Sequence, residues 1–258
     1  GRFPLVIVAH GYGNVPIVMS WLTENLASKG YVVAAIRHED SYLDPAGFPQ
    51  AALRRPLDIA FVARELQGAL GRSGEVDPAR TALIGYSMGG YGVLAAAGAT
   101  LDPAGGLVSR VPGGLLQPFA RGGALSASLV APAVKAVVAI APAGGAFGAF
   151  GADGLAGIKS PLLLVAGDHD NTVDYTSGAR VLRPGRAFES LPADVSGRRP
   201  QARLWPGAAR DADGPVEPGL VRGSGLAQGP PDRYQPALHH GVPRPVRAGR
   251  CQSQRLHR

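Results

Sequence analysis

Cysteine is almost absent from this chain of 258 residues, which has a single one, Cys251. One cysteine excludes an internal disulfide, so the redox compartment stays open. The sequence also has no apolar run near the roughly 18 residues that a membrane span needs, so we expect no transmembrane helix. No signal peptide is visible. Because Gly1 leads straight into a strand-like run, we expect a cut N-terminus, which leaves a cytoplasmic or an exported location open.

Basic and acidic residues nearly balance over most of the chain. Residues 1–179 carry 12 basic and 13 acidic residues, whereas residues 180–258 carry 14 arginines and six acidic residues. The formal net charge of +7 at pH 7 therefore comes from the C-terminal part alone. This basic part has no lysine and lacks the interleaved aromatics of many nucleic-acid-binding segments. We therefore expect no nucleic-acid partner.

The same C-terminal residues, 180–258, contain no Ile, Thr, Asn, Lys or Met and carry 11 prolines. Most of the missing residue types use AT-rich codons, and the change begins abruptly, in mid-helix. We favour a GC-rich coding region read out of frame after about residue 182; a genuine disordered basic tail is the alternative. The sequence thus predicts a core, residues 1–182, and a tail, residues 183–258, that is disordered or poorly packed.

The core is long enough for one sizeable α/β domain. Apolar, β-branched runs typical of strands buried on both faces alternate in it with runs at helical spacing. The predicted strands are residues 3–9, 31–37, 81–85, 134–141 and 161–167. The predicted helices are residues 17–30, with Gly30 at the C-cap, residues 55–70, with Pro56 in the first turn, and a small-residue helix after Ser87. This alternation predicts a doubly wound, mostly parallel α/β sheet.

Two Gly/Pro-rich segments, residues 100–133 and 142–158, interrupt the alternation. Either segment fits a lid over a site, and either fits a plain surface insertion. The sequence leaves both interpretations open.

The stretch GYSMG, residues 85–89, fits the pattern G-x-S-x-G. The pattern alone is weak in a chain with 37 glycines, but here a predicted strand runs into it and a small-residue helix follows. Small residues must flank Ser87 because the strand and helix backbones crowd together at such a turn. Ser87 would then project from the carboxyl edge of the sheet, where open α/β sheets bind ligands. We predict a nucleophile at Ser87; a packing turn with an idle serine is the alternative.

The stretch AHGYG, residues 9–13, ends the first predicted strand. Acyl transfer needs hydrogen-bond donors aimed at the developing oxyanion. The backbone N–H of Met88, just after the predicted nucleophile, is one candidate donor, and the N–H of Tyr12 in this glycine-rich loop is the other. We expect the side chain of His10 to buttress the turn.

A carboxylate is available in the stretch AGDHDNTV, residues 166–173, after the last predicted strand. A carboxylate there can orient a catalytic imidazole. We favour Asp170, which lies further into the loop, over Asp168, which fits a turn-former, and Asp174 fits a helix N-terminal charge. Side chains of neighbouring residues on a turn diverge, so we expect no metal at His169.

These three motifs together resemble the α/β-hydrolase superfamily, in the order oxyanion loop, serine elbow and Asp loop. The stretches PLVIVAHGYG, LASKGYVVAAIRHEDS and RRPLDIAFV are similar to one branch of it. That branch groups dienelactone-hydrolase-like proteins, acetylhydrolases of the platelet-activating-factor type and polyester-hydrolysing, cutinase-like enzymes. True dienelactone hydrolases use cysteine at the elbow, where this chain has Ser87. The resemblance covers about residues 3–182 and implies an α/β-hydrolase sheet that is incomplete at both ends.

The resemblance implies a serine carboxylic-ester hydrolase of the Ser-His-Asp type that acts on a small-molecule ester without a cofactor or a metal. The family's histidine is expected on a loop after one more strand beyond Asp170. No histidine lies between residues 171 and 238, and His239, His240 and His257 lie in the tail with no strand to place them. A non-catalytic or decayed α/β-hydrolase-like chain is therefore the alternative. The identity of the ester and the oligomeric state do not follow from the sequence.

Overall fold

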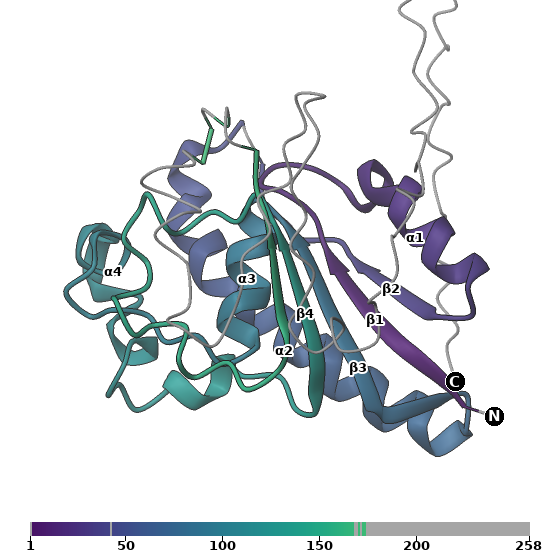
Figure 1. The fold of residues 1–258 in the computed structure, drawn as a ribbon. Helices are drawn as coiled ribbons and strands as arrows, with labels where there is room; N and C mark the ends of the chain where they lie inside the picture. The colour runs from purple at the N-terminus through teal and green to yellow at the C-terminus, as the bar shows by residue number, and fades with distance from the viewer. Residues whose placement is uncertain (1, 42, 168–169, 171, 174–258) are drawn as a thin grey trace, which may run out of the picture. The chain divides into compact units, whose positions relative to one another are not determined.

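The computed structural model describes residues 2–41, 43–167, 170 and 172–173. Its strands form one parallel sheet in the order β2-β1-β3-β4-β5 (Figure 1). The strands are β1 (Phe3–Ala9), β2 (Val32–Ile36), β3 (Val76–Tyr86), β4 (Val134–Ile140) and β5 (Leu162–Val165). Each coincides with or lies within a predicted strand, except that β3 begins five residues earlier, where Val76 pairs with Phe3. The predicted α/β class is confirmed.

Helices or 3-10 turns lie in the connections from β1 to β4, and none lies in the described connection from β4 to β5. The α-helices are α1 (Ser20–Ser28), α2 (Phe48–Ser73), α3 (Met88–Ala96) and α4 (Gly106–Arg110). The 3-10 turns are η1 (Pro16–Met19), η2 (Pro45–Gly47), η3 (Pro112–Gly114), η4 (Gln117–Phe119) and η5 (Ser126–Leu129). Gly30, just after α1, has φ 85°, a left-handed value that glycine adopts at little cost. The predicted end of this helix is confirmed.

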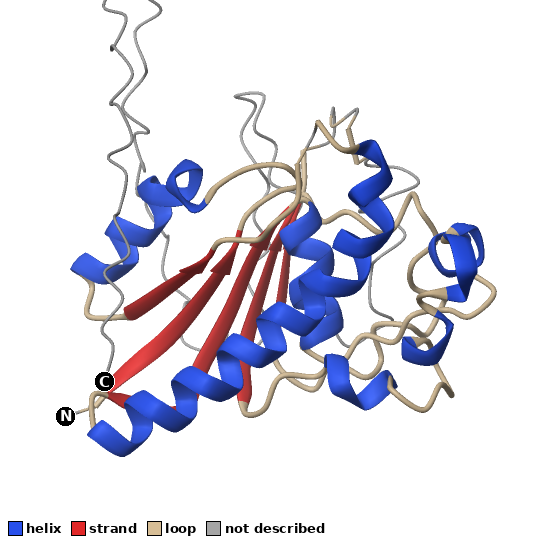
Figure 2. Ribbon diagram, turned by 180° about the vertical axis from the view of Figure 1, so that it is seen from behind, coloured by secondary structure: helices blue, strands red, loops and turns tan. Residues whose placement is uncertain are grey.

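The two faces of the sheet carry different helices. Along β1, Leu5, Ile7 and Ala9 pack in the same core cluster as α2 and α3. Val6 and Val8 point to the opposite face, where they pack with Met19, Leu22 and Leu26. Figure 2 shows α2 and α3 crossing in front of the sheet. Helices on both faces confirm the doubly wound arrangement.

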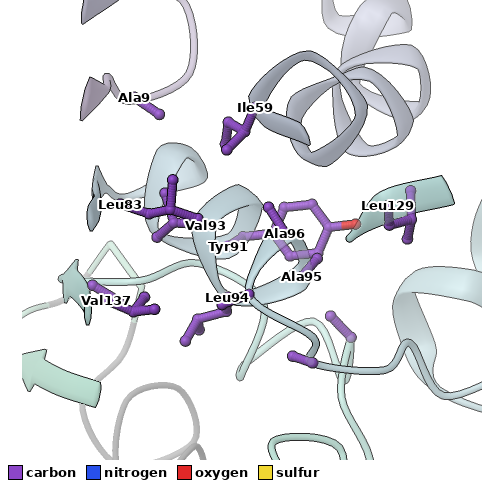
Figure 3. Close-up of a cluster of buried hydrophobic side chains, with 14 of the residues drawn as sticks. Ala9, Ile59, Leu83, Tyr91, Val93, Leu94, Ala95, Ala96, Leu129 and Val137 are labelled. Carbon is purple, nitrogen blue, oxygen red and sulfur yellow. The ribbon is translucent and has the colours of Figure 1, made fainter. Parts of the chain in front are cut away.

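Helix α3 is buried on all sides, and its residues form the centre of the core (Figure 3). Its small residues let the neighbouring helix come close. A Cβ added to Gly92 would lie 2.7 Å from Cδ1 of Ile59 on α2. The Ala/Gly-rich composition after Ser87 therefore reflects tight packing of α3 between the sheet and α2.

Helix α2 corrects one prediction. We expected a helix that begins near Arg55 with Pro56 in its first turn, but α2 begins at Phe48 and contains Pro56 in its interior. Proline has no N–H, so it leaves the carbonyl of Ala52, four residues earlier, without its helical donor. The hydroxyl of Tyr91 donates to that carbonyl at 2.9 Å. A side chain of α3 thus supplies the missing hydrogen bond to the backbone of α2, at the point where the local sequence predicts a helix boundary.

The two Gly/Pro-rich segments pair with each other. Leu101 and Phe150 form an antiparallel bridge, and the N–H of Asp102 donates to the carbonyl of Ala149 at 2.9 Å. The ring of Phe150 also lies against Tyr91, with 5.7 Å between the ring centroids. Both segments are therefore anchored to the core, and their role as a lid stays a prediction.

Two further expectations concern a membrane-spanning helix and the C-terminal tail. No helix within it is long and apolar enough to cross a membrane. The predicted tail, residues 183–258, lies outside the described residues.

Candidate active site

Ser87 lies at the turn from β3 into α3 with φ 55° and ψ −116°. A residue with a side chain rarely adopts these angles, and such strain persists only where the surroundings enforce it. Here the N–H of Ser87 donates to the carbonyl of Ile140 at 2.9 Å. Its own carbonyl accepts from the N–H groups of Tyr91 at 3.1 Å and Ala143 at 2.9 Å. Three backbone bonds, to β4, to α3 and to the loop after β4, therefore hold Ser87 in this turn.

Close packing explains the two glycines of the motif, Gly85 and Gly89. A Cβ on Gly85 would lie 2.2 Å from the carbonyl oxygen of Gly89. A Cβ on Gly89 would lie 2.1 Å from the carbonyl oxygen of Ala9 at the end of β1. Because these backbones approach so closely, both positions exclude any side chain. Packing thus accounts for the glycines, and the chemical argument depends on Ser87 and its neighbours.

The loop of residues 10–14 lies beside Ser87, because β1 and β3 are neighbours in the sheet. A Cβ added to Gly11 would lie 3.4 Å from Cβ of Ser87. Met88 is buried and begins α3, and the first N–H groups of a helix have no partner within it. The structure thus brings Ser87, Met88 and the loop that carries Tyr12 together. The donor roles of Tyr12 and Met88 stay predictions.

The ring of His10 is engaged inside the turn. Its Nδ1 is 2.7 Å from the carbonyl oxygen of Gly11, and its Nε2 accepts from the N–H of His38 at 3.2 Å. The acceptor at Nε2 requires the neutral form with the proton on Nδ1. Burial lowers the pKa of His10, which the bond to Gly11 only partly opposes. His10 therefore supports the loop and is not free to take a proton from Ser87.

The buried ring of His38 forms a second, part-buried contact that the sequence analysis missed. Its Nδ1 lies 3.0 Å from Oδ2 of Asp58 on α2. Burial lowers the pKa of His38, although the hydrogen bond to Asp58 raises it. The two histidine rings meet edge to face with 5.2 Å between their centroids. His38 follows β2 directly, but spacing alone does not reveal its partner on a distant helix.

Arg55 is also missing from the sequence predictions. It is only 1% exposed, and its Nη2 donates to both carboxylate oxygens of Asp40, at 3.0 and 2.7 Å. Arg55 follows Ala51 and precedes Ile59 by four residues each, and both of these are buried. An arginine on the apolar stripe of a helix was therefore the available signal.

Asp170 follows β5, and its carboxylate is oriented by its own turn. Oδ1 accepts from the N–H groups of Thr172 at 2.8 Å and Val173 at 3.1 Å. Its predicted contact with a catalytic histidine is not tested. Several other predicted residues of this group lie outside the described residues: Asp168, His169, Asp174, His239, His240 and His257.

An aromatic row leads away from the loop of residues 10–14. The ring of Tyr12 meets Phe48 edge to face at 5.8 Å, and Phe48 meets Phe147 in the same way at 5.7 Å. The hydroxyl of Tyr12 donates to the carbonyl of Asp44 at 3.2 Å. A cavity of about 140 Å³ lies at the far end of the row and is lined by Phe48, Pro49, Gly106, Leu107, Arg110, Val111 and Phe147. Sequence reasoning did not find this row, because its members are distant in the chain.

Similarity to known proteins is concentrated in the first part of the chain. Residues 1–104 match the model of a family described as PETase, PET hydrolase-like. Bis(hydroxyethyl) terephthalate hydrolase of Streptomyces coelicolor is 34% identical over 97 residues. That alignment covers 38% of this chain and 29% of the relative, so the chain spans less than a third of the curated protein it matches. The family match includes Tyr12, Ser87 and Met88 and ends before Asp170.

Proposed function

We propose that this protein is a serine carboxylic-ester hydrolase that works through an acyl-enzyme. The observation that carries the proposal is the strained turn of Ser87, which lies beside Gly11. A Cβ added to Gly11 would lie 3.4 Å from Cβ of Ser87. A strained strand-to-helix turn exposes a nucleophile, and the adjacent loop supplies N–H donors for an oxyanion. The match of residues 1–104 to the PET hydrolase-like family supports the same chemistry.

In the proposed reaction, the Ser87 oxygen attacks the ester carbonyl, and a histidine takes the serine proton. The carbonyl oxygen becomes an oxyanion that accepts from the N–H groups of Tyr12 and Met88. The alcohol leaves with the proton returned by the histidine, and water then hydrolyses the acyl-Ser87 ester by the same steps. Asp170 orients the histidine. No metal and no organic cofactor enters this scheme.

The histidine of this scheme is unassigned. Nδ1 of His10 bonds the carbonyl of Gly11 and its Nε2 accepts from the N–H of His38, so neither nitrogen is open to the serine proton. His38 bonds Asp58 through Nδ1, and its Nε2 is buried with no hydrogen-bond partner among the described residues. Downstream of Asp170 the sequence holds only His239, His240 and His257. Because the resemblance places the histidine after Asp170, we propose that the base comes from those three or is missing from the chain.

The substrate we propose is a small ester with an aromatic or a short acyl group. The row of Tyr12, Phe48 and Phe147 offers ring faces and edges next to the loop that would bind the oxyanion. The name of the Streptomyces coelicolor relative adds bis(hydroxyethyl) terephthalate as a candidate. The resemblance to dienelactone-hydrolase-like proteins and platelet-activating-factor acetylhydrolases adds short acyl esters.

The test is hydrolysis of p-nitrophenyl acetate, p-nitrophenyl butyrate and bis(hydroxyethyl) terephthalate by the purified chain. We expect Ser87→Ala to remove hydrolysis of all three, because the acyl-enzyme cannot form. Ser128→Ala, at an exposed serine whose hydroxyl bonds the carbonyl of Leu125, is the matched control and should keep full activity. Equal rates for Ser87→Ala and the unmodified chain would refute the proposal.

A second function class is a non-catalytic or decayed α/β-hydrolase-like chain. The absence of histidine between residues 171 and 238 favours it. It predicts only a small residual rate that does not depend on Ser87. Translating the coding DNA across codons 175–258 in all three frames separates the two causes of such inactivity. A buried strand followed by a Gly/His loop in another frame indicates a reading-frame lesion, whereas noise in both other frames indicates a genuine tail.

A further inference from the structure

The buried guanidinium of Arg55 reaches the loop beside Ser87 as well as Asp40. Its Nη1 donates to the carbonyl of His10, and its Nη2 donates to the carbonyl of Gly11 at 2.9 Å. These carbonyls lie 44 and 45 residues away in the sequence, on the loop that follows β1. One planar side chain from α2 therefore grips two successive peptide groups of the oxyanion loop.

The bonds from Arg55 to the loop carbonyls fix the direction of the Tyr12 N–H, the proposed donor to the oxyanion. In a trans peptide the C=O and the following N–H point in opposite directions. The Gly11 carbonyl belongs to the same peptide plane as the N–H of Tyr12. The Gly11 carbonyl also has Nδ1 of His10 at 2.7 Å and the N–H of Asn14 at 3.3 Å as partners within the loop. Arg55 is its partner on α2, and because it bonds the carbonyl from that side, the N–H of Tyr12 points away from α2. The same relation links the His10 carbonyl to the N–H of Gly11.

Asp40 holds the guanidinium in place. Arg55 and Asp40 are both nearly inaccessible, with side chains 1% and 4% exposed, and their closest N–O distance is 2.7 Å. Burial lowers the pKa of Arg55, while the Asp40 carboxylate opposes that shift. Arginine stays protonated in proteins, so the grip persists at every working pH. Lysine lacks the planar fork and could not reach two carbonyls and a carboxylate together.

We propose that Arg55, held by Asp40, is a positioning residue that orients the oxyanion-binding N–H of Tyr12. The catalytic part of this inference rests on the proposed function. Its structural part, control of the loop by Arg55, does not. Arg55 itself touches no substrate, because its Nη1 and Nη2 are engaged with the loop carbonyls and the carboxylate and its Nε is buried.

The test compares Arg55→Lys with Arg54→Lys, a neighbouring change at an exposed arginine of α2. Hydrogen exchange followed by mass spectrometry reports on the loop without requiring activity. We expect Arg55→Lys to speed exchange of the amides of residues 11–14 at least about tenfold, with β1 and α3 unchanged. Arg54→Lys should change neither. Unchanged exchange in the loop of Arg55→Lys would overturn the inference.

If the unmodified chain hydrolyses esters, the second readout is the split between kcat and KM for p-nitrophenyl acetate. We expect Arg55→Lys to lower kcat about 10- to 100-fold with KM within about twofold, because the misdirected donor acts only on the transition state. A role in folding alone would leave kcat per titrated active site unchanged, which would overturn the catalytic part. If the unmodified chain shows no turnover that depends on Ser87, the proposed function is refuted. The exchange experiment would still decide the role of Arg55.

Arg55→Lys could unfold the chain, since it weakens a buried ion pair. Asp40→Asn is then the variant to use, because it keeps one acceptor oxygen for Nη2 while it removes the charge and replaces the second acceptor oxygen with an amide NH2. We expect intermediate effects from it: loop exchange faster by a few fold and kcat lower by a few fold. A folded Asp40→Asn protein with the loop exchange and kcat of the unmodified chain would count against the inference.

Discussion

At the scale of single residues, the angles of Ser87 carry a measurable cost. A residue with a side chain at φ 55° and ψ −116° is strained, and glycine relieves that strain. We therefore expect Ser87→Gly to be more stable than Ser87→Ala by about 1 kcal/mol, after the greater backbone entropy of glycine is deducted. Urea unfolding of both variants measures this difference. Equal stabilities would show that the turn is relaxed.

The sequence predicted the conformation of some residues of the site but not the contacts of others. The turn of Ser87 and its two flanking glycines obey a local rule, so the stretch GYSMG predicted them. The contacts of Arg55 could not be predicted, because its partners lie on two other loops and no local pattern names them. Its unusual place on the apolar side of α2 was the only trace in the sequence.

At the scale of elements, the hydroxyl of Tyr91 replaces the donor that Pro56 removes from α2. We expect Tyr91→Phe to lower the free energy of unfolding by about 1–3 kcal/mol, because the buried carbonyl of Ala52 then has no donor. In a Pro56→Ala background the helix has its own N–H, so the same change should cost about 1 kcal/mol less.

The measurement is a double-mutant cycle by urea denaturation of the four proteins. Additive effects of Tyr91→Phe and Pro56→Ala would mean that the hydroxyl does not compensate for the proline. Burial raises the pKa of Tyr91, so the hydroxyl stays protonated and able to donate throughout the pH range of such an experiment.

Elements also show where sequence reasoning is strong. The apolar runs predicted β1, β2, β4 and β5 closely, because continuous apolar residues are a strong strand signal, although only β1 is largely buried on both faces. The start of α2 was misplaced by seven residues, because a proline in the interior of a helix looks the same in sequence as one in the first turn. The tertiary contact from Tyr91 decides between the two, and it is invisible locally.

At the scale of the whole molecule, the buried histidines link stability to pH. Burial lowers the pKa of His10 and of His38 below the ordinary value of 6.5. The unfolded chain therefore binds protons more readily than the folded one as the pH drops below 6.5. We expect stability to be fully present above 6.5 and to fall toward the lower folded-state pKa values, by at most about 1.4 kcal/mol per pH unit for each histidine.

Thermal unfolding between pH 7.5 and pH 5.5 tests this link. His38→Asn removes one of the two titrating groups and should make the decline shallower. A stability that stays level or rises as the pH falls through this window would contradict the assignment of neutral, buried rings at these two positions.

The parallel sheet followed from the alternation of strands and helices, since parallel strands need crossover connections. The order of its strands was not predicted. Function was less accessible at this scale. The three motifs predicted the nucleophile, the oxyanion loop and a carboxylate, and the structure brings Ser87, Met88 and the loop of Tyr12 together. The histidine could not be placed, because the sequence after about residue 182 shows no strand or helix period that would position one.

The central claim is that Ser87 is an activated nucleophile. The most direct measurement is incubation of the chain with a fluorophosphonate probe, followed by intact-mass analysis and peptide mapping. We expect a phosphonyl adduct on the peptide that contains Ser87, formed with loss of fluoride, and no adduct on Ser87→Ala. An unlabelled Ser87 at probe concentrations that fully label a known serine esterase, or equal labelling of Ser87→Ala, would contradict the account.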